Sequence, residues 1–483
     1  MNTVPVGDVV PELVMLGGAV LVLVHALVAR RDRQWRGAPL ALSTLAAAAG
    51  LVSFRAASGG PTFTFSGTWA IDPLGTGAVL VILAVTAIVV VLSPAWFATD
   101  ARHGEYYAVL LFSALGAIVM ARAADLMELT FGIVLSSVTG YALAAYHRRS
   151  PASVEAGIKY FLIGAVTNAL FLVGVALLYG AAGSTVYSTI RTRVANGDST
   201  LLVAAAALLA LGLAFKLGAV PAHAWMPDVA DGAPAPVAAF LTAAPKVGAV
   251  IALARLMLVF PMDASGWRPL VAILAAVTMT VGNLAALWQD NVRRLLGWSA
   301  VSQTGYALMA VVALGRSAAA IPALLYFLIA YALGNLAAFG VVIELRGQAD
   351  RLRYAALARE HPWLAAALVT SFLSFVGIPP LAGFVGKLAL FDAVIDAGYG
   401  WLAVLAVANT VVSLAYYARV IGPLYFEPAT GGASPLTGGA KALPVLGRWS
   451  ALAIAVSTTG VITLGLAAEW VLAALRGARV LPG

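Results

Sequence analysis

The feature that most constrains this chain is a series of uninterrupted apolar runs, each about twenty residues long. The first extends from Val9 to Ala29, and a later run, Gly77 to Leu92, is apolar on every side of a helix. About 20 apolar residues in an α-helix cross the hydrocarbon core of a bilayer. A transmembrane β-strand would be a shorter segment of alternating character. We therefore expect an all-α, polytopic membrane protein.

The apolar runs predict about fourteen transmembrane helices in one integral membrane domain over residues 1–483. The composition agrees, because 62% of the residues are hydrophobic and 10% are charged, against roughly 45–50% and 25% in soluble domains. The expected spans are 9–29, 37–54, 72–93, 106–121, 126–146, 155–181, 199–220, 235–260, 269–288, 295–314, 317–344, 361–393, 400–418 and 449–474.

Several classes of chemistry are excluded or disfavoured. The chain has no cysteine, which excludes disulfides and thiolate ligands, and none of its five histidines stands at ligand spacing from a second one. The glycines form no phosphate-binding loop next to a strand. The 29 Lys and Arg are scattered between apolar runs, so they read as topology signals and do not indicate a nucleic-acid partner. We expect neither a metal nor a cofactor in this chain.

The basic residues predict the orientation. When the connection with Arg30, Arg31, Arg33 and Arg36 is placed in the cytoplasm, the cytoplasmic connections carry 16 Lys and Arg and the opposite side carries 8. This bias follows the positive-inside rule. With an even number of spans, both termini lie on the outer side, and the first run is expected to be retained as a helix.

The lysines are distributed unlike the arginines. The chain has 24 Arg and 5 Lys, yet four of the five Lys (Lys159, Lys216, Lys246 and Lys387) lie inside apolar spans. Arginine stays protonated in proteins, whereas a desolvated lysine can give up its proton. Charged residues within spans mark ion pathways, although lysines also snorkel or form static ion pairs. We interpret the four as candidate proton carriers.

Acidic residues inside spans are few. Glu128 has no basic neighbour at helical spacing, so its partner must come from another helix, and Asp125 is expected at a solvated helix end. Glu155 precedes Lys159 by four residues, the favourable order for a pair on one helix face. We read Glu155 as part of an interfacial pair and Lys159 as functional.

Two spans contain helix-breaking residues. Pro221 removes the hydrogen bond to the carbonyl of Leu217, beside Lys216, and the break is expected near 216–236. Pro379 and Pro380 free the carbonyls of Phe375 and Val376, with the break near 375–387. Carbonyls freed at membrane depth need a protein-lined or wet site. One lysine precedes the first break and one follows the second, which predicts two inverted repeats, 122–260 and 269–418, between the N-terminal helices (9–121) and the last helix (449–474).

His223 lies seven residues after Lys216, across the first break. A single histidine in an apolar helix is commonly a packed or hydrogen-bonded residue. An unperturbed histidine has a pKa near 6.5, and His223 stands between two candidate proton carriers. We therefore interpret it as a proton relay.

The motifs together resemble the antiporter-like membrane subunits of proton-pumping NADH:quinone oxidoreductase, respiratory complex I. The resemblance covers nearly the whole chain and rests on the segments 155–161, 215–234, 293–299, 305–306, 331–340, 377–387 and 416–420. It implies a fourteen-helix fold similar to cation/proton antiporters. By motif match, Glu128, Lys216, Lys246 and Lys387 resemble the family's glutamate of the fifth helix and its lysines of the seventh, eighth and twelfth helices. Lys159 resembles a further lysine of the sixth helix, and His223 the linking histidine.

The resemblance also implies partners and location. NADH, FMN, iron–sulfur clusters and quinone are expected in partner subunits, next to other antiporter-like and small membrane subunits, in a bacterial inner membrane. Only residues 476–483 follow the last predicted helix, which favours a member without a long lateral helix. Gln303 stands where many relatives have histidine, and Arg293 and Arg294 replace a pair that usually contains lysine.

These observations lead to one mechanistic hypothesis. A cytoplasmic half-channel loads Lys216 or Lys246, the proton crosses by way of His223 and hydrated polar groups to Lys387, and it is released outside. Pairing with Glu128 controls the first step. Three alternatives stay open: a sodium/proton antiporter subunit of a multi-subunit antiporter or hydrogenase-type complex, a solute transporter, and a structural spacer that pumps nothing.

Overall fold

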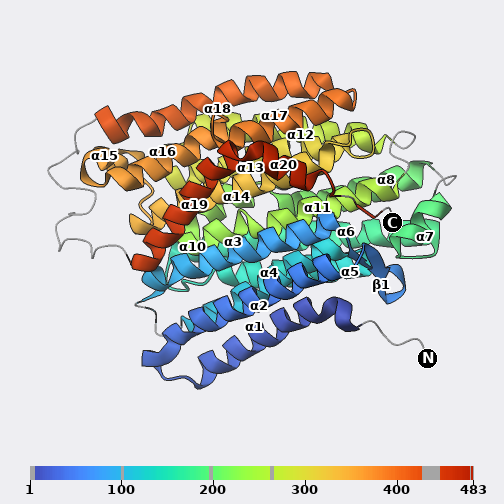
Figure 1. The fold of residues 1–483 in the computed structure, drawn as a ribbon, viewed down its shortest axis with the longest axis horizontal. Coiled ribbons are helices and arrows are strands. Elements are labelled where there is room, and N and C mark those ends of the chain that lie inside the picture. Colours follow the sequence, from blue (N-terminus) through green and yellow to red (C-terminus); the bar gives the residue numbers. More distant parts are fainter. Residues whose placement is uncertain are drawn as a thin grey trace.

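The computed structural model describes residues 6–98, 100, 103–194, 199–260, 266–426, 447–478 and 480–481. Arg102 and Lys441, which the charge count places in the cytoplasm, lie outside these residues. The long helices run side by side along one direction (Figure 1). Within these described residues, thirteen helices are long and apolar enough to cross a membrane, which confirms the all-helical membrane fold. The fourteenth predicted span is the interrupted pair α16 and α17.

The helices fall into the following order. The α-helices are α1 (Val10–Val28), α2 (Gly37–Ser58), α3 (Pro73–Phe97), α4 (Gly104–Arg122), α5 (Leu126–Ala144), α6 (Pro151–Ala182), α7 (Tyr187–Val194), α8 (Ser199–Leu217), α9 (Trp225–Gly232), α10 (Ala235–Leu241), α11 (Ala244–Val259), α12 (Trp267–Leu287), α13 (Val292–Ala313), α14 (Ala320–Glu344), α15 (Leu357–Glu360), α16 (Pro362–Val376), α17 (Ala382–Asp396), α18 (Gly400–Phe426), α19 (Arg448–Leu466) and α20 (Ala468–Leu475). Short 3-10 helices cover Val6–Val9, Arg31–Arg36, Phe65–Gly67 and Arg351–Tyr354.

A two-stranded hairpin is the one sheet among the described residues. Strands β1 (Thr62–Thr64) and β2 (Trp69–Ile71) pair antiparallel between α2 and α3. The hairpin covers the connection from α4 to α5, where the amide of Ala124 donates to the carbonyl of Thr68. Asp125 is the N-cap of α5, and its carboxylate accepts hydrogen bonds from the amides of Met127 and Glu128. Asp125 was expected to be solvated, but the structure buries it because the hairpin and Thr185 cover it.

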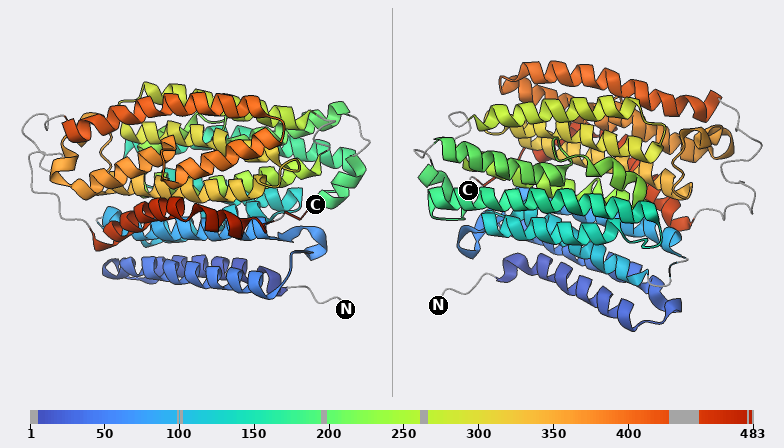
Figure 2. Two further views of the ribbon diagram at one scale, coloured as in Figure 1. Left: turned by 45° about the horizontal axis from the view of Figure 1, so that its top comes forward. Right: turned by 180° about the vertical axis from the view of Figure 1, so that it is seen from behind.

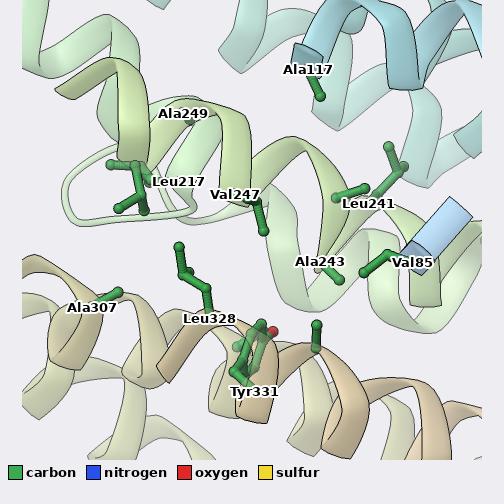
Figure 3. Packing of buried hydrophobic residues seen from close by; sticks show 14 of the residues in the cluster. Val85, Ala117, Leu217, Leu241, Ala243, Val247, Ala249, Ala307, Leu328 and Tyr331 are labelled. Carbon is green, nitrogen blue, oxygen red and sulfur yellow. The ribbon is translucent and has the colours of Figure 1, made fainter. Parts of the chain in front are cut away.

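The core lies around α10, α11, α13 and α14, whereas α1, α2, α6 and α19 lie at the edges with about a third of each buried (Figure 2). The span that contains α10 and α11 is buried throughout. Figure 3 shows Val247 and Leu328 pointing toward one another across the space between α11 and α14. Polar groups in this region are therefore surrounded by tightly packed apolar side chains.

Two buried ion pairs connect the N-terminal helices to the rest of the bundle. The Arg255 guanidinium donates to both carboxylate oxygens of Asp72, at 2.7 and 2.8 Å, and Arg122 lies 3.2 Å from Glu12. The amide of Leu481 also donates to Asp72. The start of α3 and the end of the described chain therefore meet at the same end of the bundle.

Candidate functional site

Three of the predicted lysines are buried in the bundle. Lys216 near the end of α8, Lys246 in the first turn of α11 and Lys387 on α17 are each 1–3% exposed. Their ammonium groups contact hydroxyls, carbonyls and aromatic rings. Among the described residues, no carboxylate forms an ion pair with any of the three. By contrast, the buried arginines Arg122 and Arg255 both have carboxylate partners.

Lys216 lies one residue before the end of α8 and contacts α5. Its Nζ donates to Ser136 Oγ at 3.3 Å. The backbone beyond it turns at Gly218, which has a φ of +67° that suits glycine. Trp225 Nε1 donates to the carbonyl of Phe215, and the Thr304 hydroxyl donates to the carbonyl of Leu217 at 2.8 Å. The carbonyl that the sequence predicted to be freed by Pro221 is thus satisfied by α13.

Lys246 follows a break that the sequence did not predict. The expected span 235–260 is divided into α10 and α11 around Thr242 and Ala243. Lys246 Nζ donates to the carbonyl of Ala300 at 2.6 Å and lies 4.8 Å from the ring centre of Tyr331. The Tyr331 hydroxyl donates to the carbonyl of Thr242. Tyr331 therefore supports both the broken backbone and the lysine.

Lys387 reaches back across the second break. Its Nζ donates to the carbonyl of Val376 at 3.1 Å and to Thr410 Oγ1 at 3.3 Å, and it lies 4.1 Å from the ring centre of Tyr306. The other freed carbonyl, that of Phe375, accepts from Gln303 Nε2 at 3.2 Å. Both carbonyls that the prolines free in this span thus have side-chain donors.

A small cavity lies beside Lys387. It measures about 10 Å³ and is lined by Gln303, Tyr331, Ser374, Phe375 and Lys387, with other residues. This is close to the smallest space that holds one water molecule, and the lining supplies several polar partners. The cavity joins the surroundings of Lys387 to Tyr331, the tyrosine that contacts Lys246.

His223 lies in the turn between α8 and α9 and is half-buried. Its ring lies near the backbone of Pro221 and 5.5 Å from the ring of Trp298, and its Nδ1 is buried without a hydrogen-bond partner among the described residues. No hydrogen bond joins it to a described lysine. The structure therefore places the histidine at the first break without connecting it directly to a proton carrier.

Glu128 is not brought together with Lys216. It lies in the first turn of α5, near Thr68 of the hairpin connection, and its Oε2 is buried without a hydrogen-bond partner among the described residues. Lys216 meets α5 at Ser136, eight residues further along, which corresponds to about 12 Å of helix at 1.5 Å per residue. The predicted pairing of Glu128 with Lys216 is therefore absent, because the two groups contact different levels of α5.

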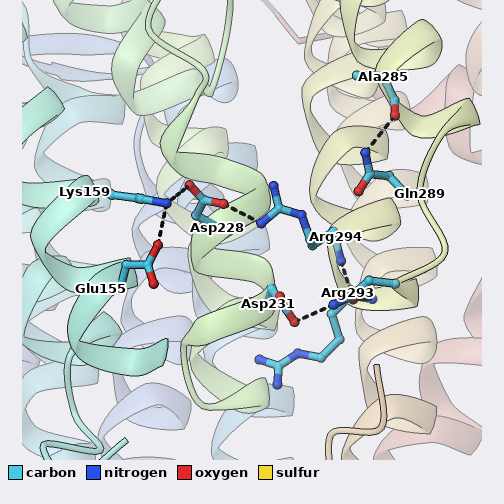
Figure 4. Close-up of polar contacts among 9 residues, drawn as sticks. Glu155, Lys159, Asp228, Asp231, Ala285, Gln289, Arg293 and Arg294 are labelled. Atoms are coloured by element: carbon cyan, nitrogen blue, oxygen red, sulfur yellow. Dashed lines mark hydrogen bonds and ion pairs between the residues drawn. The ribbon is translucent and has the colours of Figure 1, made fainter. Parts of the chain in front are cut away.

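Lys159 is not buried with the other lysines. Its side chain is 43% exposed and forms ion pairs with Glu155 at 2.7 Å and Asp228 at 2.9 Å. Asp228 also pairs with Arg294 at 2.5 Å, so α6, α9 and α13 are joined by one charged chain at the surface (Figure 4). The expected interfacial pair of Glu155 is present, and it includes the lysine that was expected to be functional.

Four residues that the sequence did not indicate as site residues complete the polar line together with Gln303, which the sequence analysis had noted. They are Thr304 and Tyr306 on α13, Tyr331 on α14 and Thr410 on α18, and all five contact the lysines or the freed carbonyls. Polar side chains within apolar spans were the available signal. Their mutual positions depend on how α13, α14 and α18 pack, which the sequence does not specify.

Comparison with known proteins places this arrangement in a family. Residues 123–413 match the family model described as NADH:quinone oxidoreductase/Mrp antiporter, TM. The chain is 41% identical to NADH-quinone oxidoreductase subunit N 1 of Streptomyces griseus, covering 96% of this chain and 97% of the relative. It is 40% identical to NADH-quinone oxidoreductase subunit N of a Mycobacterium species, covering 86% and 88%. Among solved structures, a chain of respiratory complex I from Thermus thermophilus is similar with a TM-score of 0.82 and 30% identity, covering 97% of this chain and 100% of that one.

Proposed function

Because the chain belongs to the subunit N family of NADH-quinone oxidoreductases, we propose that Lys216, Lys246 and Lys387 carry protons through it while partner subunits reduce quinone. The chain is a proton-translocating membrane subunit, and NADH, FMN, iron–sulfur clusters and quinone are bound by its partners. The observation that carries the site assignment is that three buried lysines, each beside a break in its helix, have no carboxylate partner among the described residues and donate to hydroxyls and backbone carbonyls.

The hydrogen bonds suggest an order of transfer. Lys216 donates to Ser136 of α5, and the carbonyl of the next residue, Leu217, is connected by the Thr304 hydroxyl to the carbonyl of Ala300, which accepts from Lys246. Because backbone carbonyls accept hydrogen bonds but do not pass protons on, a proton moving from Lys216 to Lys246 is proposed to use water beside these groups. From Lys246 it passes Tyr331 and the small cavity to Lys387 at the second break. Moving one proton across the whole membrane against the potential costs about 2.3 kcal/mol per 100 mV. His223 is proposed as a relay at the surface of the first break, and not between the lysines.

The two halves are proposed to be inverted repeats, 122–260 and 269–418. The family match over 123–413 coincides with these bounds. In each half, the lysine at the broken helix contacts the second helix of a packed pair: Lys216 contacts Ser136 of α5, which follows α4, and Lys387 lies over Tyr306 of α13, which follows α12. The packing of α4 on α5 and of α12 on α13 is also alike, because Gly132 abuts Met120 and Gly305 abuts Met279.

The orientation is proposed from charge. The connections with Arg30–Arg36, Arg148–Arg149 and Arg293–Arg294 lie at one end of the bundle, and we place that end in the cytoplasm of a bacterial cell. Asp8 pairs with Arg55 at the end of α2, and Leu481 contacts Asp72 at the start of α3. Both ends of the described chain therefore lie at the other end, which we place outside.

The test uses the whole complex reconstituted in vesicles. Lys216→Met and Lys387→Met should lower the number of protons moved per quinone reduced by at least one, because each removes a carrier that its neighbours cannot replace. Lys159→Met is the matched control, since its lysine is exposed and should leave this ratio unchanged. An unaltered ratio in both core variants would overturn the proposal. Proton movement that needs sodium but no electron donor would favour secondary antiport.

A further inference from the structure

Two cavities follow one another along the outer face of α6. The first measures about 500 Å³ and is lined by residues that include Arg148, Arg149, Val154, Glu155 and Ile158. The second measures about 380 Å³ and is lined by residues that include Leu162, Val166, Leu170, Leu211 and Pro221. Ile158 of the first cavity and Leu162 of the second are one helical turn apart on the same face of α6. The two neighbouring cavities together are called the α6 groove.

One end of the α6 groove is positively charged. Lys159 is held by Glu155 and Asp228. The guanidinium groups of Arg148 and Arg149 are exposed, and neither has a hydrogen-bond or ion-pair partner among the described residues. Two arginines at the membrane surface are therefore available to an anion. Basic pockets at this level of membrane proteins bind the phosphate groups of anionic lipids.

The rest of the α6 groove is apolar and opens to the lipid side. Ile158, Leu162 and Val166 are each more than half exposed. The groove extends from Ile158 to Leu170, which is about 18 Å along the helix axis, close to the thickness of one leaflet, about 15 Å. Its lining includes Pro221 of the first helix break. An acyl chain anchored at the arginines would therefore pass beside this break.

We propose that the α6 groove binds an anionic phospholipid, with its phosphate on Arg148 and Arg149 and one acyl chain along α6 as far as Pro221. A soluble anion would use only the charged end. The apolar length of the groove, its opening on the outer face of α6 and its two available arginines match the two chemically different ends of a phospholipid. The lipid covers the surface of the break that precedes the polar line.

The experiment measures lipid retained by the intact complex. The complex is equilibrated in vesicles of phosphatidylcholine with phosphatidylglycerol and is then extracted. Native mass spectrometry of the intact complex measures how much phosphatidylglycerol remains bound. Arg148→Gln/Arg149→Gln should weaken retention of phosphatidylglycerol about thirtyfold, since each basic residue near an anionic headgroup contributes a factor of about five. The control Arg30→Gln/Arg31→Gln changes an arginine pair on the same side, outside the groove, and should retain the lipid.

A second pair of variants tests the apolar part. Leu162→Trp fills the groove and should displace phosphatidylglycerol although both arginines remain, whereas Leu172→Trp, also exposed on α6 but outside the groove, should not. Equal retention by the arginine variant and its control would overturn the proposal. Photo-cross-linking from position 158 should yield a lipid adduct, and cross-links to a protein subunit alone would show that a neighbouring chain occupies the groove instead.

Discussion

Gln303 and Thr304 are consecutive residues of α13, and each donates a hydrogen bond to a freed carbonyl of a different broken helix. Thr304 donates to Leu217 at 2.8 Å, and Gln303 donates to Phe375 at 3.2 Å. One turn of α13 therefore holds both breaks at a set separation. Because Lys216 and Lys387 lie beside these breaks, this turn also helps to position two of the proposed carriers.

Thr304→Val should destabilise the first break. The substitution keeps the shape of the side chain but removes the donor, so a buried carbonyl loses its partner at a cost of about 1–3 kcal/mol. We expect a lower melting temperature of the solubilised complex and slower proton pumping, with Thr304→Ser restoring both. Thermal unfolding followed by tryptophan fluorescence measures the first effect. A Thr304→Val complex as stable as the parent would show that the hydrogen bond contributes nothing.

Gln303→Leu should destabilise the second break by a similar mechanism and by about 1–3 kcal/mol. Gln303 and Thr304 share no hydrogen-bond partner in the described structure. The losses of stability in the double variant should therefore add within about 0.5 kcal/mol. Denaturation of all four proteins under one condition measures this. A larger interaction energy would mean that the two breaks are coupled through α13.

Glu128→Gln should leave Lys216 undisturbed. The carboxylate contacts the hairpin connection and lies about 12 Å along α5 from the serine that Lys216 contacts. We expect proton pumping within about twofold of the parent, measured with a pH-sensitive dye in vesicles. Loss of pumping with normal quinone reduction would restore the hypothesis, based on the sequence, that Glu128 controls the first step.

Asp228→Asn should weaken the surface ion pairs that join α6, α9 and α13. Asp228 pairs with both Lys159 and Arg294, whereas Glu155 pairs with Lys159 alone from a more exposed position. Exposed pairs contribute little, so Glu155→Gln should cost less than about 0.5 kcal/mol. Asp228→Asn breaks two pairs of a less exposed carboxylate and should cost more, about 1–2 kcal/mol. Equal melting temperatures of the two variants would contradict this ranking.

Acid should weaken the attachment of α3 to α11. Burial alone would raise the pKa of Asp72, but the ion pair with Arg255 and the hydrogen bonds from Arg255, Gly75 and Leu481 outweigh it, so the pKa is lowered. The stabilisation by this ion pair is therefore complete at pH values above the pKa of an aspartate in the unfolded chain, about 3.9. It is lost as the pH falls through the lower pKa that Asp72 has in the folded protein.

The matching variant is Asp72→Asn. It leaves Arg255 buried without its carboxylate, which should cost about 3–5 kcal/mol at neutral pH, and it should flatten the fall in melting temperature below about pH 4. Asp32→Asn is the control, because Asp32 is exposed and pairs only with Arg30. An unchanged acid profile in Asp72→Asn would show that other carboxylates set the acid stability.

The sequence by itself determined the parts that depend on local composition. Twenty-residue apolar runs specify transmembrane helices whatever they pack against, and Pro221 and Pro379 remove backbone hydrogen bonds wherever they stand. The placement of Lys216, Lys246 and Lys387 within membrane-spanning segments followed from their apolar neighbours in the chain. Recognition of the family rested on motifs of the same local kind.

Only the tertiary structure decided which polar groups meet. Lys159 has apolar neighbours in sequence, yet it faces the surface because α6 lies at the edge of the bundle. Glu128 lies on α5 at a different level from the serine that Lys216 contacts, and the donors for the freed carbonyls of Leu217 and Phe375 come from α13, more than 70 residues away. Hydrogen bonds depend on distances of about 3 Å between helices, and the packing of distant segments sets those distances.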